Sequence, residues 1–274
     1  MIKAEPTITL PLPHRQALQG AVKNLENQDF ASRLADYAGR PISRALRLMP
    51  KAATDRINRV VENAILNSLN VAIRSIELKS KRPPAQRSAS VLAGLSGGVG
   101  GFFGIAALPI ELPLTTMLML RAIADIARHN GEDLSTIQAR LACVEVFALG
   151  APEADRQMGF GYYASRALIS RLAADAAGIF VDRGAANLSA PVVGSLVAEI
   201  ATRFGVVVTE RSAASALPVL GALGGATVNV IFMNHFQRIA RGHFAIRRLE
   251  RHYGPHVVRE LYNAHTTTRR RAVR

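Results

Sequence analysis

The chain has 274 residues, a net charge of +14, one cysteine and no tryptophan; 49% of its residues are apolar, but only 5% are aromatic. A core made of Ala, Leu, Ile and Val favours close-packed helices over an all-β sandwich, and the length allows one or two domains. The single cysteine, Cys143, excludes an intramolecular disulfide and a zinc cluster built from several cysteines. A chain without disulfides is typical of a reducing compartment, so we expect a cytoplasmic protein.

Positive charge is concentrated towards the two ends of the chain. Residues 1–90 hold 15 Lys and Arg against 7 Asp and Glu, residues 91–200 hold 7 against 10, and residues 201–274 hold 12 against 3. Both ends could therefore face an anionic partner, either phospholipid head groups or nucleic acid. The alternative is a basic surface that contacts only solvent.

An extended arm, a helix and a linker are expected in the first third of the chain. Three prolines indicate the arm over residues 1–13. Apolar residues recur at helical spacing over residues 54–78, and a basic, proline-containing run over residues 79–87 ends this helix. We expect residues 14–265 to form a single all-helical domain.

The first of two nearly charge-free stretches spans residues 88–120, where Glu111 is the only charged side chain. Its glycine-rich start lacks the Lys-Ser/Thr pair of a phosphate-binding loop. Pro109 and Pro113 should break the stretch into two segments, each shorter than the roughly 20 residues that cross a bilayer. We therefore expect a hairpin, followed by a helix over residues 113–130.

Apolar periodicity predicts three further helices, over residues 134–149, 161–172 and 192–208, and leaves residues 176–190 ambiguous. The second charge-free stretch, residues 212–237, contains the best single candidate for a transmembrane helix at residues 214–233. A buried helix pair in a soluble bundle explains this stretch equally well.

The C-terminal part of the chain is predicted to be helical and basic. Residues 236–253 form an amphipathic pattern that ends at Gly254. A short helix over residues 256–264 should follow, and residues 266–274 have the composition of a basic, disordered tail.

Three blocks within residues 88–254 carry a resemblance to a known family: LSGGVGGFFGIAALPIELPLTTMLMLRAIADIARHNG, ERSAASALPVLGALGGATVNVIF and FQRIARGHFAIRRLERHYG. Their order and spacing resemble the EcsC protein family. The resemblance implies an all-helical cytoplasmic protein and supplies no catalytic residues. The two apolar blocks are also distantly similar to the C-terminal helical domains of some membrane-associated GTPases, which favours contact with a membrane.

Two polar side chains stand out in the apolar stretches. Glu111 must find a partner or take up a proton, and Arg121 is its natural candidate. A structural or helix-capping role for Glu111 is favoured over a functional one. Asn229, in the second stretch, is expected to link helices through its amide hydrogen bonds.

A row of polar residues is expected on the C-terminal amphipathic helix. His243, Arg247 and Glu250 are spaced to share one face, which could bind phosphate or a lipid head group, or could be a solvated, self-paired face. His235 and His243 lie about 12 Å apart along a helix, too far to share a metal ion. Neither a metal nor a cofactor is predicted, and no serine-hydrolase motif occurs.

These patterns predict an all-α bundle of roughly ten helices around two apolar hairpins broken by Gly and Pro. The favoured function is a membrane-associated, non-enzymatic accessory protein that contacts anionic lipid or a membrane protein at the cytoplasmic face. The expected contact residues are Phe102, Phe103, Leu220, Leu223, Arg238, Arg241 and Arg248.

Two other functions remain open at this point. The first is a soluble enzyme or small-ligand binder with a pocket around Glu111, Arg121 and Asn229. The second is a basic scaffold for nucleic acid or an acidic protein. The oligomeric state is not predicted.

Overall fold

A computed structural model describes residues 10–26, 30, 34, 46–74, 107–151, 161–183, 188–215 and 221–272. These residues form eight α-helices and contain no β-strand. The helices are α1 (Leu12–Glu26), α4 (Lys51–Arg74), α6 (Leu108–His129), α7 (Ile137–Leu149), α9 (Tyr162–Arg183), α10 (Pro191–Ser215), α11 (Gly221–Tyr253) and α12 (Pro255–Ala272). The predicted all-α class is confirmed, with eight helices in the described part of the chain where roughly ten were expected for the whole.

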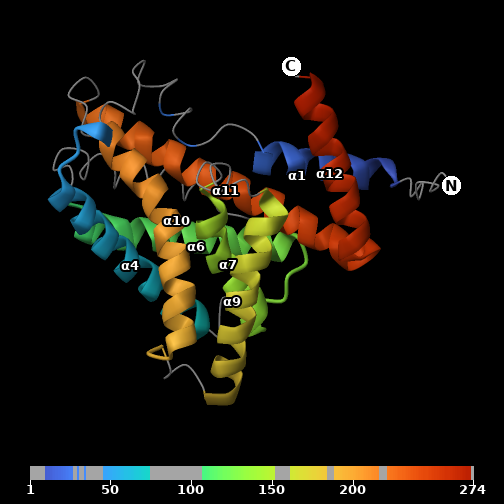
Figure 1. Ribbon diagram of the computed structural model, residues 1–274, viewed down its shortest axis with the longest axis horizontal. Helices are drawn as coiled ribbons and strands as arrows, with labels where there is room; N and C mark the ends of the chain where they lie inside the picture. The colour runs from blue at the N-terminus through green and yellow to red at the C-terminus, as the bar shows by residue number, and fades with distance from the viewer. Residues whose placement is uncertain are drawn as a thin grey trace.

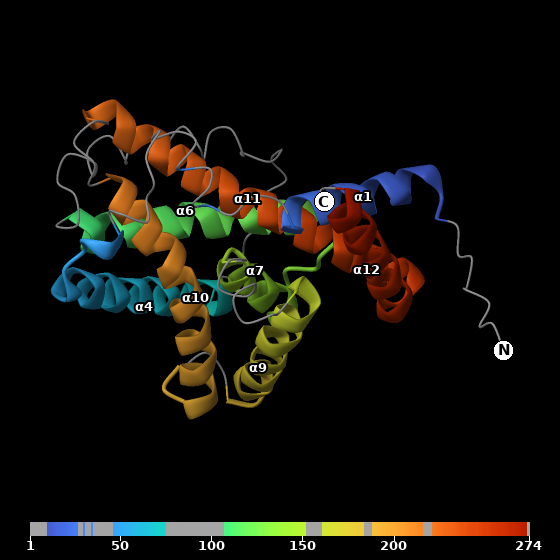
Figure 2. The same cartoon turned by 45° about the horizontal axis from the view of Figure 1, so that its top comes forward.

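The helices pack as a bundle (Figure 1), and α4, α6 and α11 run in similar directions along it. In Figure 2 all three of these helices begin on the left of the view, where α10 also ends. Helix α10 crosses α4 and packs beside α9, while α1 and α12 cover the far half of α11. One end of the molecule therefore gathers the starts of three helices.

Helix α7 lies in the centre of the bundle because it is apolar on every side. All residues from Ala139 to Leu149 are buried, and α4, α6, α9, α10 and α11 all contact this helix. A helix without a polar face must be covered by neighbours all round. Its Phe147 ring meets Phe204 of α10 at 5.1 Å and Phe236 of α11 at 5.8 Å between centroids, and these contacts form the middle of the core.

The two charged residues of α7 are buried but have partners. Arg140 donates hydrogen bonds to the carbonyl oxygens of Ile73 (2.9 Å), Leu134 (2.7 Å) and Ser135 (2.7 Å). Glu145 accepts one from the Ser170 hydroxyl of α9 at 2.8 Å. Buried polar groups need such partners, so these two side chains tie the end of α4 and the middle of α9 to the central helix.

The predicted break at Pro113 is wrong. Helix α6 begins at Leu108, with Pro109 in its first turn and Pro113 inside it. Pro109 occupies a position where the backbone N–H has no helical partner, and there proline is tolerated. Around Pro113 the helix is held by burial, because Leu112 and Thr116 pack into the bundle where α6 meets α4 and α11. The part of the hairpin expected before residue 107 lies outside the described residues.

The second charge-free stretch is divided between two helices. Helix α10 ends at Ser215 and α11 begins at Gly221, so the described residues of the stretch 214–233 belong to two different helices. Helix α11 contains 33 residues and includes the amphipathic segment predicted over residues 236–253. It ends before Gly254, as predicted, and the φ of 83° at this glycine is the left-handed conformation that often follows a helix end.

Three other boundaries differ from prediction. Helix α9 continues to Arg183, which settles the first part of the ambiguous segment, and α1 begins at Leu12 rather than after an arm ending at residue 13. Helix α12 runs to Ala272, so residues 266–272, expected to be a disordered tail, are helical. Hydroxyl groups of Thr266 and Thr267 donate to backbone carbonyls one turn earlier, as in a regular helix.

Gly150, directly after α7, lies against the Phe236 side chain of α11. A Cβ atom at this position would lie 2.2 Å from Cε1 of Phe236, and we expect Gly150→Ala to lower the free energy of unfolding by about 2 kcal/mol through overpacking. Gly178 of α9 is a matched control, because a Cβ atom there would meet no other atom within 4 Å and Ala favours a helix by about 1 kcal/mol. Urea titration followed by circular dichroism measures both; equal effects at the two positions would contradict this packing.

Candidate functional site

Glu111 is paired with an arginine from another helix. Its side chain lies in the first turn of α6, is 8% exposed, and accepts a hydrogen bond from Nη2 of Arg211 near the end of α10. The Arg211 guanidinium also lies over the Phe232 ring of α11, with 5.0 Å from Cζ to the ring centroid. The negative Glu111 lies near the partially positive start of α6, and the positive Arg211 lies near the partially negative end of α10, so both helix dipoles favour these charges. This buried pair therefore joins α6, α10 and α11.

The prediction that Arg121 pairs with Glu111 is wrong. Because α6 is continuous, Glu111 and Arg121 lie ten residues apart on one helix, about 15 Å along its axis. Arg121 is exposed while Glu111 is buried. Sequence reasoning missed Arg211, although it is the last charged residue before the second charge-free stretch. The position of Arg211 directly before the charge-free stretch was the signal that could have identified it as a partner for Glu111.

Asn229 is fully buried on α11, three residues before Phe232. Residues three apart on a helix are neighbours on its surface, so Asn229 lies close to the ring that covers Arg211. Glu111 and Asn229 thus belong to the same region of the bundle, but Arg121 does not. The pocket expected around all three residues is not formed as predicted.

The polar row on α11 is engaged in contacts within the protein. Glu250 accepts two hydrogen bonds of 2.7 Å from Arg166 of α9 and one of 3.1 Å from the Tyr163 hydroxyl. His243 is fully buried, and its Nδ1 lies 3.0 Å from the Tyr162 hydroxyl. Both contacts join α11 to α9, which is the self-paired alternative foreseen for this row.

Arg247, the middle member of the row, pairs with Glu132 in the segment between α6 and α7. Its Nε and Nη2 each donate to this carboxylate at 2.9 Å, and Arg251 adds a further ion pair to Oε1. The hydrogen bonds and charges of the two arginines lower the pKa of Glu132 although burial opposes the shift. Nε and Nη2 of Arg247 therefore already bind a carboxylate of the protein itself.

Burial shifts the pKa values of three titratable groups in this part of the bundle, His243, Glu145 and Cys143. Desolvation, followed by the charges of Arg166 and Arg247, lowers the pKa of His243 well below its ordinary value, so His243 is neutral at pH 7. Desolvation raises the pKa of Glu145 in spite of its hydrogen bond from Ser170. It also raises the pKa of the Cys143 thiol, which therefore does not act as a thiolate nucleophile.

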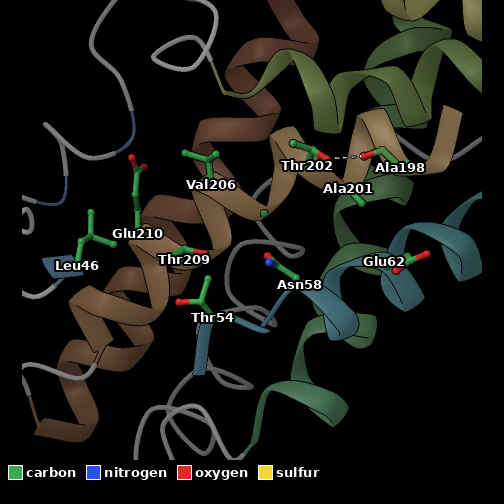
Figure 3. A pocket seen from close by; sticks show the side chains of 11 residues that line it. Leu46, Thr54, Asn58, Glu62, Ala198, Ala201, Thr202, Val206, Thr209 and Glu210 are labelled. Atoms are coloured by element: carbon green, nitrogen blue, oxygen red, sulfur yellow. Dashed lines mark hydrogen bonds between the residues drawn. The ribbon is translucent and has the colours of Figure 1, made fainter. Parts of the chain in front are cut away.

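A groove lies between α4 and α10 (Figure 3) and has a volume of about 550 Å³. Its polar lining comes from Thr54, Asn58 and Glu62 of α4 and from Thr202, Thr209 and Glu210 of α10. Leu46, Ala198, Ala201, Gly205 and Val206 supply the apolar lining. None of the residues predicted to form a pocket lines this groove. The available signal in the sequence was the spacing of Thr54, Asn58 and Glu62, which lie four residues apart on one face of α4.

The expected membrane contacts are only partly described. Phe102, Phe103, Leu220 and the side chain of Leu223 lie outside the described residues. Arg238 is 8% exposed, so it does not belong to an exposed basic face as predicted. Arg241 is exposed and Arg248 is half-buried, which leaves both accessible to an anionic surface.

The described residues contain no group of three or more His, Cys, Asp or Glu side chains that could hold a metal ion. In the same ranges one helix, α10, is long and apolar enough to cross a membrane, and half of its most apolar window is buried within the bundle. Core helices of soluble proteins often share these properties, so α10 is weak support for a membrane span.

Fold and polar contacts together define an all-α protein whose buried charges hold helices to one another. The family model of the EcsC protein family matches residues 14–249, which is most of the chain. The chain therefore belongs to the EcsC protein family. The match ends within α11, so α12 lies beyond it. Comparison with curated proteins and with solved structures found no match.

The Glu111–Arg211 pair gives a stability prediction. Replacing Glu111 with Gln leaves the buried Arg211 guanidinium without its counter-charge, and we expect the free energy of unfolding to fall by about 3 kcal/mol. Arg121→Gln is the control, because this exposed side chain should contribute less than about 0.5 kcal/mol. Urea unfolding of both variants tests the pairing, and a larger loss for Arg121→Gln would refute it.

Glu145 gives a prediction for pH. Since its folded pKa is raised, its contribution to stability is complete below its ordinary pKa and is lost as the pH rises through the folded value. Glu145→Gln keeps an acceptor for Ser170 without a charge, so the variant should gain roughly 1 kcal/mol over wild type at pH 8 and little at pH 4. Thermal unfolding at several pH values measures this difference, and a gain that shrinks as the pH rises would contradict it.

Proposed function

We propose that this EcsC family member is a membrane-associated, non-enzymatic accessory protein that binds anionic lipid at the cytoplasmic face. The surface assigned to lipid is the docking end of the bundle. It is defined by Arg47 and Leu48 just before α4, Lys51 at the start of α4, and Ile110 and Leu114 in the first two turns of α6. Figure 2 shows these two helix starts on the same side of the molecule.

Exposed apolar side chains are the observation that carries this proposal. Ile110 is 83% exposed, Leu48 is 74% exposed and Leu114 is 52% exposed. Ile110 and Leu114 are four residues apart and so share one face of α6. Large apolar side chains grouped on a surface are typical of interaction sites, and a shallow position among lipid head groups would remove them from water.

The charges around the docking end suit an anionic surface. Arg47 and Lys51 are exposed beside Leu48, and each basic residue near an anionic membrane contributes about 1 kcal/mol to binding. Helices α4, α6 and α11 begin at this end, so the positive ends of their dipoles add to the attraction. Nucleic acid would benefit from the same charges but not from Ile110 and Leu114.

Co-sedimentation with vesicles tests the proposal. Wild-type protein should pellet with phosphatidylglycerol vesicles at low salt, and part of the bound fraction should persist at roughly 0.5 M salt because apolar contacts are not screened. Ile110→Ser/Leu114→Ser should lower the salt-resistant fraction at least about five-fold, because it removes apolar area that would otherwise leave water. Leu168→Ser/Val181→Ser is the matched control, since it removes two exposed apolar side chains from α9, away from the docking end.

Two results would end this proposal. One is wild-type protein that stays in the supernatant with anionic vesicles at low salt. The other is salt-dependent retention on DNA together with no preference for lipid, which would favour the basic scaffold instead.

A further inference from the structure

The face of α9 that is turned away from the bundle carries few polar side chains. Helix α9 packs on α7 and α10 with its opposite face, and its end and the start of α10 project away from α11 in both Figure 1 and Figure 2. Among the described side chains of α9, Arg171 and Asp175 are the only polar ones that are exposed. Together with them, the α9 face consists of Ala164, Ala167, Leu168, Ala174, Gly178 and Val181. The outer face of a helix that meets only water carries mostly charged and polar residues, so this composition indicates a contact surface.

Two large apolar side chains stand beside open space on the α9 face. Leu168 is 44% exposed and Val181 is 64% exposed. A Cβ atom added at Gly178 would meet no other atom within 4 Å, so nothing covers the helix backbone there. Two helices pack when the side chains of one enter the gaps between the side chains of the other. The α9 face offers both the apolar side chains and the gaps that such packing needs.

Arg171 and Asp175 carry opposite charges and lie four residues apart, so they share the α9 face. Within the described part of the chain, neither of them forms an ion pair or a hydrogen bond through its side chain. An arginine one turn before an aspartate is the less favourable order for pairing along a single helix. Both charges are therefore available to a partner.

We propose that the protein forms a two-fold symmetric dimer in which the α9 faces of two copies pack antiparallel. A two-fold axis at the midpoint of Arg171 and Asp175 places Arg171 beside the partner's Asp175, and the same contact then recurs with the roles exchanged. Leu168 and Gly178 each lie five residues from that midpoint, so Leu168 comes level with the partner's Gly178. The large side chain of one copy thus meets the smallest residue of the other.

The charges of the α9 face favour a second copy over other occupants. An anionic membrane would repel Asp175, whereas a second copy presents an arginine to it by symmetry. Helix α9 has 22 residues and is about 33 Å long, so the contact is small and we expect a weak, reversible dimer. The α9 face is separate from the docking end, and the dimer does not depend on lipid binding.

Sedimentation velocity of the full chain tests the dimer. Over roughly 1 to 200 µM protein, the sedimentation coefficient should rise from that of a monomer to that of a dimer, with a dissociation constant on the order of 10 µM. Arg171→Asp and Asp175→Arg should each weaken dimerisation at least about ten-fold, because like charges then face each other across the axis. Arg59→Asp, which reverses an exposed charge on α4, is the matched control and should leave the dissociation constant unchanged.

Combining the two charge reversals separates pairing from a general loss of structure. An equimolar mixture of Arg171→Asp and Asp175→Arg should associate although each variant alone does not, because one then presents two acids and the other two bases. The double variant Arg171→Asp/Asp175→Arg should dimerise within about two-fold of wild type, since the exchanged charges are again complementary. Leu168→Ser should weaken the dimer at least about five-fold through lost apolar burial.

Three results would overturn the proposal: wild-type protein that stays monomeric at roughly 200 µM, single charge reversals that dimerise as tightly as wild type, or a mixture of the two that does not associate. Its failure would leave the lipid proposal untouched. At about 1 µM protein the chain is mostly monomeric. Gly178→Ala and Leu168→Ser/Val181→Ser therefore remain valid controls for stability and for vesicle binding at that concentration.

Discussion

Burial of α7 on every side is the constraint on which the arrangement of the other helices depends. Five helices contact it, and its two buried charged residues need hydrogen-bond partners from these neighbours. Arg140 and Glu145 meet this need by binding the end of α4 and the middle of α9. The tight contact between Gly150 and Phe236 lets α11 pack against the end of α7. Surface features follow from this packing: the groove lies where α10 crosses α4, and the docking end lies where the long helices begin.

Local sequence patterns predicted most of the helices, because their signals are contained within a few turns. The apolar period of residues 54–78 corresponds to α4 (Lys51–Arg74), and Gly254 ends α11 as predicted. Proline was the main source of error. Pro113 was expected to break the apolar stretch, but packing of α6 on both sides of it outweighs the local cost of proline, and periodicity alone does not report such packing.

The partners of buried charges were the part of the site that sequence could not supply. Glu111 was recognised from its apolar surroundings, yet Arg211 is 100 residues away and comes from a helix whose crossing angle no local pattern determines. Likewise His243, Arg247 and Glu250 were placed on one face, but their partners come from α9 and from the segment before α7. In each case the residue type indicated a need for a partner, and only the tertiary structure identified it.

The position of α1 has a consequence for how the protein is made. The apolar face of α1, which includes Leu18 and Val22, is covered by α11, and Glu26 accepts a hydrogen bond of 2.8 Å from Tyr262 of α12. At ordinary rates of translation, a ribosome needs roughly 10 to 40 seconds to proceed from α1 to α11. During that interval α11 has not yet been made, so the apolar face of α1 in the nascent chain lacks the helix that covers it in the folded protein.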